Sequence, residues 1–378
     1  MKFHLPTKIF FGSGIVARFK EIVDENFKDS SLFLVTDRGI IDAGIGEKVL
    51  SQFPKVEVFD EVEQNPKHQT VNKAGEIVRK LKPDLIVGLG GGSSLDAAKA
   101  IALLATNPGA IEDYEGRGRY KTAPLPVVAI PTTCGTGSEV TWVSVVTHTG
   151  RRFKMSIKGP LMFPAVALVD PELLVSLPAP LVASTGMDAL THAIEAYTVR
   201  AATLITDIFA REALKLIFQS LERAYLNIKG DQEAREKLML ASTLAGIAFG
   251  NSDVGAVHCL AEALGSLYDT PHGVANSVFL PQVMEFNLSA AKKRYAEIAG
   301  LMGIEEEAEE EAAAELIRRI KFLSSALSIP HFKELGVEES RFKEIAQKSF
   351  ENNSNPSNPR EASAEDYLTI LKRISEGR

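Results

Sequence analysis

A glycine loop between an apolar run and an alanine-rich run most strongly constrains the fold. The stretch beginning at Asp84 reads DLIVGLGGGSSLDAAKAIALLA. Its first part predicts a buried strand, and its last part predicts a helix. Backbone amides at a helix N-terminus bind phosphate when no side chain shields them. We therefore expect Gly91, Gly92 and Ser93 to bind a phosphate-containing cofactor in an α/β domain; a tight turn without a ligand is the alternative.

The loop differs from the usual dinucleotide fingerprint. Gly88 and Gly90 fit the G-x-G part, but Ser93 stands where the third glycine is expected. The nearest candidate ribose-binding carboxylate, Asp37, precedes the loop instead of following it. The predicted fold is therefore a variant Rossmann-like parallel sheet.

Asp37 follows the strand-like run SLFLVT at residues 31–36. A carboxylate at the end of such a strand binds the adenosine ribose hydroxyls and repels a 2′-phosphate. Capping of the next turn is an equally good explanation on local grounds, and the adjacent Arg38 would weaken the discrimination. The pattern favours NAD over NADP.

A second loop of small and hydroxyl residues, PTTCGTGSEVT, follows the strand-like run PVVAIP. Its hydroxyls can hydrogen-bond a cofactor or satisfy their own backbone. Two such loops, each after a strand, favour one ligand shared between them. The candidate cofactor residues of this loop are Thr132, Thr133, Thr136 and Thr141.

Two histidine-bearing stretches lie in the second half, STGMDALTHAIEAYTV from Ser184 and VHCLAEALGSLYDTPHGVAN from Val257. Asp188 and His192 are four residues apart, so on a helix they project from one face. His258 and His272 are separated by a DTP turn, and His272 stands near the start of a new helix, GVANSVFLP. One carboxylate and three imidazoles suit iron(II) or catalytic zinc, although a single histidine is more often an ordinary core or surface residue.

The pattern of elements changes near the proline-bearing segment LPAPL, residues 177–181. Before it, strands and helices alternate, and after it the sequence has helical periodicity almost to the end. We expect an α/β dinucleotide-binding domain at residues 1–180 and an all-helical metal-binding domain at residues 181–378.

Charge and cysteine content narrow the possible partners and the compartment. The net charge is −7 with no Lys/Arg cluster, which argues against nucleic acid and anionic membrane. No apolar run is long enough to span a bilayer, and MKFHLPTKIFFG lacks the apolar core of a signal peptide. The only two cysteines, Cys134 and Cys259, cannot form a disulfide framework, so the cytoplasm is expected.

Five stretches in a fixed order, FFGSGI, GGGSSLDAAKA, PTTCGTGSEVT, DALTHAIEAY and H-x13-HGVAN, resemble the iron-dependent (group III) alcohol dehydrogenase family of the dehydroquinate synthase-like superfamily. The resemblance covers nearly the whole chain. It implies a two-domain fold, a homodimer, and iron bound by Asp188, His192, His258 and His272. It also implies four further cofactor contacts: Asn65, Asp96, Lys154 and Leu173.

The chain departs from the family pattern at Glu262. Many members carry another histidine four residues after the third ligand, where this chain has Glu262. On a helix this residue shares a face with His258. It is a candidate for orienting a ligand or moving a proton, and a surface or ion-paired glutamate is the alternative.

A phosphate cradle, a ribose carboxylate and a Lewis-acid metal fit reversible hydride transfer between a small alcohol or diol and NAD. A lyase of the dehydroquinate synthase type, which uses NAD only transiently, is the first alternative. Such a lyase needs basic residues for an anionic substrate, and neither ligand stretch contains Lys or Arg. A nucleotide-binding regulatory protein with a structural metal is a weaker alternative, because closed structural sites typically use cysteine ligands.

Overall fold

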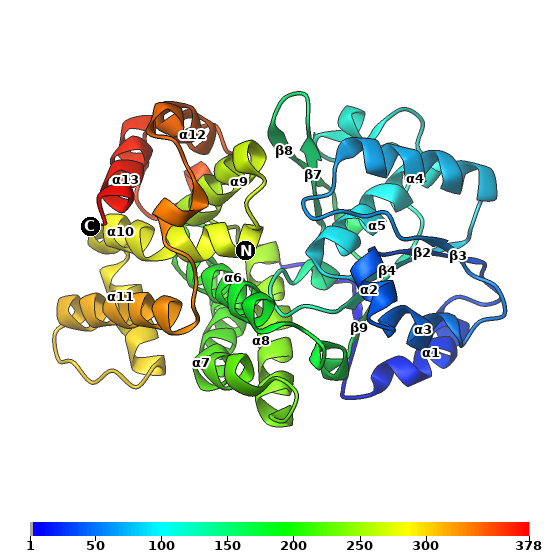
Figure 1. Cartoon of the computed structure of the whole chain (residues 1–378), viewed down its shortest axis with the longest axis horizontal. Helices are drawn as coiled ribbons and strands as arrows, with labels where there is room; N and C mark the ends of the chain where they lie inside the picture. Colours follow the sequence, from blue (N-terminus) through cyan, green and yellow to red (C-terminus); the bar gives the residue numbers. More distant parts are fainter. Residues whose placement is uncertain (1–2, 378) are drawn as a thin grey trace. The chain divides into compact units, whose positions relative to one another are not determined.

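The computed structural model describes residues 3–377 and divides into two compact units. One unit spans His4–Leu177, and the other contains the chain from Pro178 onward (Figure 1). Among the helices of residues 3–377, not one combines the length and the apolar character needed to cross a membrane.

The first unit is built on a parallel sheet that, within residues 3–377, has the strand order β1-β9-β6-β4-β2-β3. Neighbouring strands in this order all run in the same direction, so their carboxyl ends lie along one edge. The strands are β1 (Lys8–Phe11), β2 (Leu32–Val35), β3 (Glu57–Phe59), β4 (Leu85–Gly90), β6 (Val127–Pro131) and β9 (Val166–Val169).

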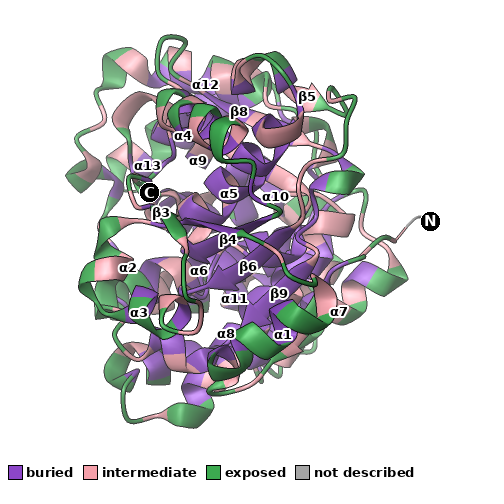
Figure 2. Ribbon diagram, turned by 90° about the vertical axis from the view of Figure 1, so that its right-hand side faces the viewer, coloured by how far each residue is buried: buried purple, intermediate pink, exposed green. Residues whose placement is uncertain are grey.

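Helices cover both faces of this sheet, which explains why its central strands are apolar throughout. Leu34 of β2 packs in a cluster with Phe19 and Val49, whereas the next residue, Val35, packs in a cluster with Val71 on the opposite face. The central strands are accordingly coloured as buried in Figure 2. The helices are α1 (Phe19–Asn26), α2 (Arg38–Asp42), α3 (Ile45–Leu50), α4 (His68–Leu81) and α5 (Gly92–Thr106).

A smaller sheet with the order β5-β8-β7 completes this unit. β7 (Val143–His148) and β8 (Phe153–Lys158) form an antiparallel hairpin, and β5 (Gly116–Arg117) pairs with β8 in parallel. The hairpin turn contains Thr149 and Gly150.

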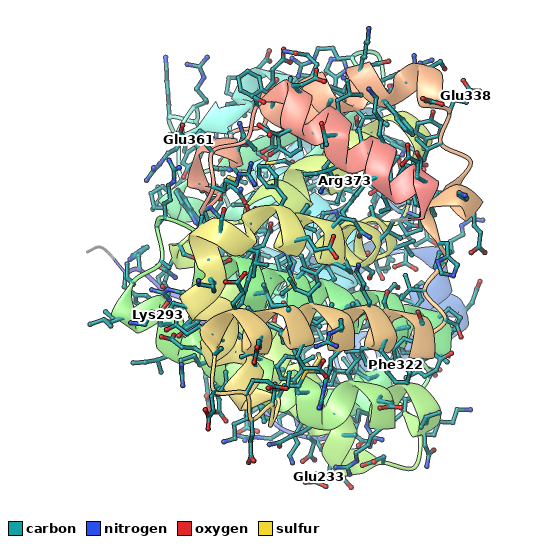
Figure 3. The ribbon with its side chains drawn as sticks, turned by 90° about the vertical axis from the view of Figure 1, so that its left-hand side faces the viewer. Glu233, Lys293, Phe322, Glu338, Glu361 and Arg373 are labelled. Carbon is teal, nitrogen blue, oxygen red and sulfur yellow. The ribbon has the colours of Figure 1, made fainter. Side chains whose placement is uncertain are left out.

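The second unit is helical within residues 178–377. α10 begins at His272, as predicted, but continues through Pro281 to Leu301. Figure 3 labels Lys293 of α10, Phe322 of α11 and Arg373 of α13 in this unit. Phe322 is 74% exposed. The helices are α6 (Ala179–Thr198), α7 (Leu204–Asn227), α8 (Gln232–Asn251), α9 (Ala256–Tyr268), α10 (His272–Leu301), α11 (Glu309–Ala326), α12 (Phe342–Phe350) and α13 (Ala364–Glu376).

The predicted fold class is confirmed: an α/β unit with a parallel sheet is followed by an all-helical unit. The predicted functional residues gather at one place in each unit. In the α/β unit they gather at the carboxyl edge of the sheet, and in the helical unit they gather where α6, α9 and α10 meet.

Candidate metal centre and cofactor loops

Four predicted metal ligands come together in the helical unit. Asp188 and His192 lie one turn apart on α6, His258 lies in the first turn of α9, and His272 is the first residue of α10. One ligand atom from each of these side chains lies within 4.8 Å of the others. The first three side chains are at most 5% exposed, whereas that of His272 is 27% exposed, so the cluster is accessible at His272.

The three imidazoles form a row of tilted rings, and the first of them stacks on a phenylalanine. The His192 ring lies 4.2 Å from the ring of Phe249 on α8, and its centroid is 4.5 Å from that of His258. The His258 and His272 centroids are 5.2 Å apart. Packing on an apolar ring therefore holds His192 at one end of the row.

Asn276 is completely buried at the centre of this cluster, one turn after His272. Its Nδ2 lies 2.6 Å from Asp188 Oδ1 and 3.1 Å from the Nε2 atoms of His258 and His272. The amide therefore orients the Asp188 carboxylate. Sequence reasoning missed this residue, although its i+4 spacing from His272 places both on one helix face.

Glu195 is the second functional residue that sequence reasoning missed. Its Oε2 lies 2.5 Å from His258 Nδ1, and its Oε1 accepts the backbone N–H of Val257 at 2.8 Å. A carboxylate that accepts from Nδ1 of a histidine keeps the proton on Nδ1. The lone pair then lies on Nε2, where it can bind a metal ion. The signal was present on α6, because Glu195 stands three residues after His192 and seven after Asp188, on the same face.

The electrostatics of the cluster favour a bound cation. Burial raises the pKa of the Asp188 carboxyl, but the three imidazoles and the Asn276 amide lower it by more, so that its net pKa lies below the ordinary value. Burial lowers the pKa of His258, and the carboxylates of Glu195, Asp188 and Glu262 raise it by more. An ionised Asp188 with three imidazoles is a donor set that fits one divalent first-row metal ion.

The two predicted cofactor loops also come together, at the carboxyl ends of the neighbouring strands β4 and β6. A Cβ on Gly92 would lie 2.5 Å from Thr136 Cγ2, and one on Gly91 would lie 3.2 Å from Thr133 Cγ2. Gly92 opens α5, and Ser93 follows it. A Cβ on Gly92 would overlap Thr136, so glycine at this position lets the two loops approach and leaves the helix N-terminus unshielded, as phosphate binding requires.

Asp37 lies beside the glycine loop, at the end of β2. It caps α2, because its Oδ1 accepts the N–H of Ile40 at 3.1 Å, and its Oδ2 accepts the hydroxyl of Ser94 at 3.2 Å. Arg38 is directed to Asp60, with 3.9 Å between their charged atoms. The structure thus places Asp37 as a turn cap next to the loop, and its contact with a ribose stays a prediction.

Asp96 holds the second loop through protein contacts. Its Oδ1 accepts the hydroxyl of Ser138 at 2.6 Å, and its Oδ2 accepts the N–H of Val145 at 2.9 Å. The Lys99 Nζ lies 3.0 Å from the same carboxylate and 3.4 Å from Thr141 Oγ1. Sequence reasoning missed this role of Lys99, which is 1% exposed.

The remaining predicted cofactor residues fall into two groups. Asn65 and Lys154 lie together, because Lys154 Nζ donates to Asn65 Oδ1 at 2.9 Å. Thr132 and Leu173 are each 2% exposed, and Leu173 packs in the core cluster under the sheet.

Comparison with known proteins identifies the family. The model described as iron-containing alcohol dehydrogenase matches residues 6–171, and that described as the C-terminal part of the Fe-containing alcohol dehydrogenase family matches residues 182–375. Alcohol dehydrogenase 4 of Saccharomyces cerevisiae is 39% identical over 99% of this chain and 98% of its own length. The NAD-dependent methanol dehydrogenase of Bacillus methanolicus is 39% identical over 98% of both chains.

Solved structures agree with these matches. A crystal structure of 1,3-propanediol oxidoreductase superposes with a TM-score of 0.94 at 38% identity, over 99% of both chains. The sequence-based identification of an alcohol dehydrogenase is confirmed: the chain belongs to the iron-containing alcohol dehydrogenase family.

Proposed function

We propose that Asp188, His192, His258 and His272 bind one iron(II) ion, with which this alcohol dehydrogenase interconverts small alcohols or diols and their carbonyl products, using NAD. The observation that carries the proposal is the convergence of these four ligand atoms within 4.8 Å, from three helices. Relatives named for methanol and 1,3-propanediol support a small substrate.

Each side chain has a separate task in this proposal. Bound iron(II) supplies Lewis-acid polarisation of the substrate oxygen, and bound NAD supplies the hydride acceptor. The four ligands hold the ion, Asn276 orients Asp188, and Glu195 keeps the Nε2 lone pair of His258 directed at the site. Because His272 is the most exposed ligand, we place the substrate on its side of the cluster.

The chemistry around the ligands favours a neutral substrate. Residues 179–198 and 256–283, which contain all four ligands, include neither Lys nor Arg. A phosphate or carboxylate substrate would need such a cation for charge-assisted hydrogen bonds. This supports a neutral alcohol over the anionic substrate of a dehydroquinate synthase-type lyase.

We assign the cofactor to the carboxyl edge of the sheet. The amides of Gly91, Gly92 and Ser93 bind its diphosphate, and the Thr132, Thr133, Thr136 and Thr141 loop, the Asn65–Lys154 pair and Leu173 surround the remainder. Asp96 holds this loop in place by accepting the hydroxyl of Ser138. Asp37 binds the ribose and favours NAD, and the engagement of Arg38 with Asp60 supports this preference. Replacement of Asp37 by Ala should then raise kcat/KM with NADP relative to NAD, and an unchanged ratio would count against the assignment.

Glu262 acts, in our proposal, as a support for the ligand helix. It lies one turn after His258, and its Oε2 accepts the Asn352 Nδ2 at 2.6 Å. This contact favours an orienting task over proton transfer.

Anaerobic reconstitution tests the proposal. The metal is removed, iron(II) or zinc is added separately, and NADH formation is followed with methanol, 1,3-propanediol and longer alcohols. Activity with iron(II) supports the full assignment. Activity with zinc alone would overturn the choice of metal, and no NADH with either metal would overturn the substrate class.

We further propose a cytoplasmic homodimer. Within residues 3–377, β1 pairs only with β9, and its residues Ile9 and Phe11 are 37% and 39% exposed, which leaves an apolar sheet edge available to a second copy. The only two cysteines are both buried, which fits a reducing compartment. Light scattering of the purified protein and cell fractionation test the two statements.

A further inference from the structure

The first turn of α9, which carries His258, is capped by residues from elsewhere in the chain. The helix follows Gly255, which has no side chain with which to cap it. The N–H of Ala256 donates to Asn358 Oδ1 at 3.1 Å, and the N–H of Val257 donates to Glu195 Oε1 at 2.8 Å. Two of the N–H groups that a helix start leaves without intrahelical partners are thus satisfied from outside.

Gly255 makes this arrangement possible. A Cβ at this position would lie 2.9 Å from Asn358 Oδ1 and 3.0 Å from Glu195 Oε1. Both capping oxygens therefore occupy space that any other residue would fill. His258 is the third residue of the helix, so the same turn sets the position of its ring.

Glu195 needs both of its oxygens. One accepts the Val257 N–H, and the other faces His258 Nδ1 at 2.5 Å. When His258 offers its Nε2 lone pair to a metal, Nδ1 carries the proton, so both groups that face Glu195 are donors. A carboxylate accepts from both, whereas the amide of glutamine has only one acceptor oxygen.

Asn358 connects the start of α9 to α10. It is 1% exposed, and it exchanges two hydrogen bonds with Asn287 of α10, at 2.7 and 3.0 Å. Its Nδ2 also donates to the carbonyl of Arg360 at 2.7 Å. Because α10 begins with His272, this one amide joins the two helices that carry His258 and His272.

The loop formed by residues 352–358 contacts the α9 region at two further places. Before the helix, Ser354 and Ser357 donate to the two carboxylate oxygens of Asp253, at 3.0 and 2.6 Å. One turn past His258, Asn352 donates to Glu262. The loop therefore holds α9 before, at and after its first turn.

We propose that Glu195 and Asn358 are positioning residues for the metal, and that loop 352–358 sets how tightly the ion is retained by fixing the first turn of α9. This inference rests on the proposed metal site. The loop contacts α9 at the helix start and at Glu262, one turn away from His258, so its effect on the ion is indirect.

The test compares four variants of the full-length protein. Glu195→Gln removes one acceptor at constant shape, and Asn358→Ala removes the Ala256 cap. Asn355→Ala is the matched control for the loop, because the Asn355 side chain bonds Phe350, Ala362 and Tyr367, none of which is in α9. Glu297→Gln is the control for α6 contacts, because Glu297 accepts from Tyr197, away from the ligands.

The readouts are the dissociation constant for Co²⁺ by chelator competition, the Co²⁺ absorption spectrum, and the melting temperature of the metal-free protein. We expect Glu195→Gln and Asn358→Ala to weaken Co²⁺ binding by about 10- to 100-fold, the range found when a partner behind a ligand is lost. The spectrum should change as the His258 geometry changes. Both controls should keep a Co²⁺ affinity within about twofold of wild type, even where they lower the melting temperature. Substitutions away from a site usually have effects of this size.

The outcomes separate the two proposals. Unchanged Co²⁺ affinity in folded Glu195→Gln and Asn358→Ala would overturn the positioning inference alone. Equal weakening in all four variants would overturn it too, because affinity would then follow general stability. If Asn358→Ala does not fold, the isosteric Glu195→Gln still decides. Wild-type protein that binds no Co²⁺, or binds it as well after His192→Ala, would overturn the metal site itself.

Discussion

The cofactor loops and the metal centre are built in opposite ways. The cofactor loops use backbone amides and small residues, placed by the carboxyl ends of adjacent parallel strands. The metal centre uses side chains that converge from three helices and are held by further buried polar groups. The cofactor loops therefore depend on glycines, which leave the backbone amides uncovered. The metal centre depends on the side chains of specific residues.

A glycine stands at the start of the helix in each region, for different reasons. Gly92 opens α5 where a Cβ would meet Thr136, so it keeps the two cofactor loops close together. Gly255 precedes α9 where a Cβ would meet Asn358 and Glu195, so it admits the two external caps. The same residue type thus leaves amides open to the proposed cofactor in one region and to protein side chains in the other.

The largest effect is expected when a ligand of the metal centre is removed and the cofactor loops are left intact. His272→Ala should abolish metal retention and lower kcat/KM by about 1,000-fold, because Lewis-acid stabilisation is worth several kcal/mol and each 1.4 kcal/mol is tenfold. NADH affinity should stay within about twofold, since the ligand lies outside the cofactor loops, and single-site effects away from a ligand are small. Metal analysis and NADH fluorescence titration check this. Loss of NADH binding together with metal would contradict the separation of the two sites.

The next largest effect is expected when the glycine loop is altered and the metal centre is left intact. Gly92→Ala should raise the KM for NAD by about 10- to 100-fold, because the displaced loop loses one charge-assisted hydrogen bond of about 1.5–3 kcal/mol. Metal content should not change. Gly300→Ala is the control, since within residues 3–377 no heavy atom outside its own helix lies within 4 Å of its Cβ position. Steady-state kinetics decide, and equal KM values in the two variants would refute the cradle.

A smaller effect sharpens the comparison between the two glycines. Gly255→Ala should weaken metal binding by about tenfold, as for the loss of a partner behind a ligand, while the KM for NAD stays unchanged. Chelator competition measures the first quantity and kinetics the second. An effect on NAD without one on metal would reverse the assignment of this glycine.

The smallest expected effect concerns Glu262. In Glu262→Gln the amide oxygen can still accept the Asn352 Nδ2, so kcat/KM should fall by no more than about threefold, the scale of one neutral hydrogen bond. The pH–rate profile should match that of wild type. A lost or shifted limb of the profile would instead make Glu262 a proton-transfer group.

Much of both sites could be predicted because their signals are local. The glycine loop is a continuous strand–loop–helix pattern, and Asp188 and His192 share a helix face by spacing alone. Glu195 and Asn276 carried the same kind of signal, at i+3 from His192 and i+4 from His272, but only their buried contacts give them a purpose. The carboxylate of Asp96, which was expected at the cofactor, reaches Ser138 and Val145 across two loops, and its contact with the cofactor stays a prediction.

The amino-acid sequence by itself determined the fold class, the family and the four candidate ligands, because periodicity, glycine placement and fixed spacing act over a few residues. Tertiary structure alone decided the partners of His258. Asn358 lies far along the chain from α9, and no spacing rule connects its amide to the N–H of Ala256. Packing brings them together because buried polar groups must find hydrogen-bond partners, wherever in the chain those partners lie.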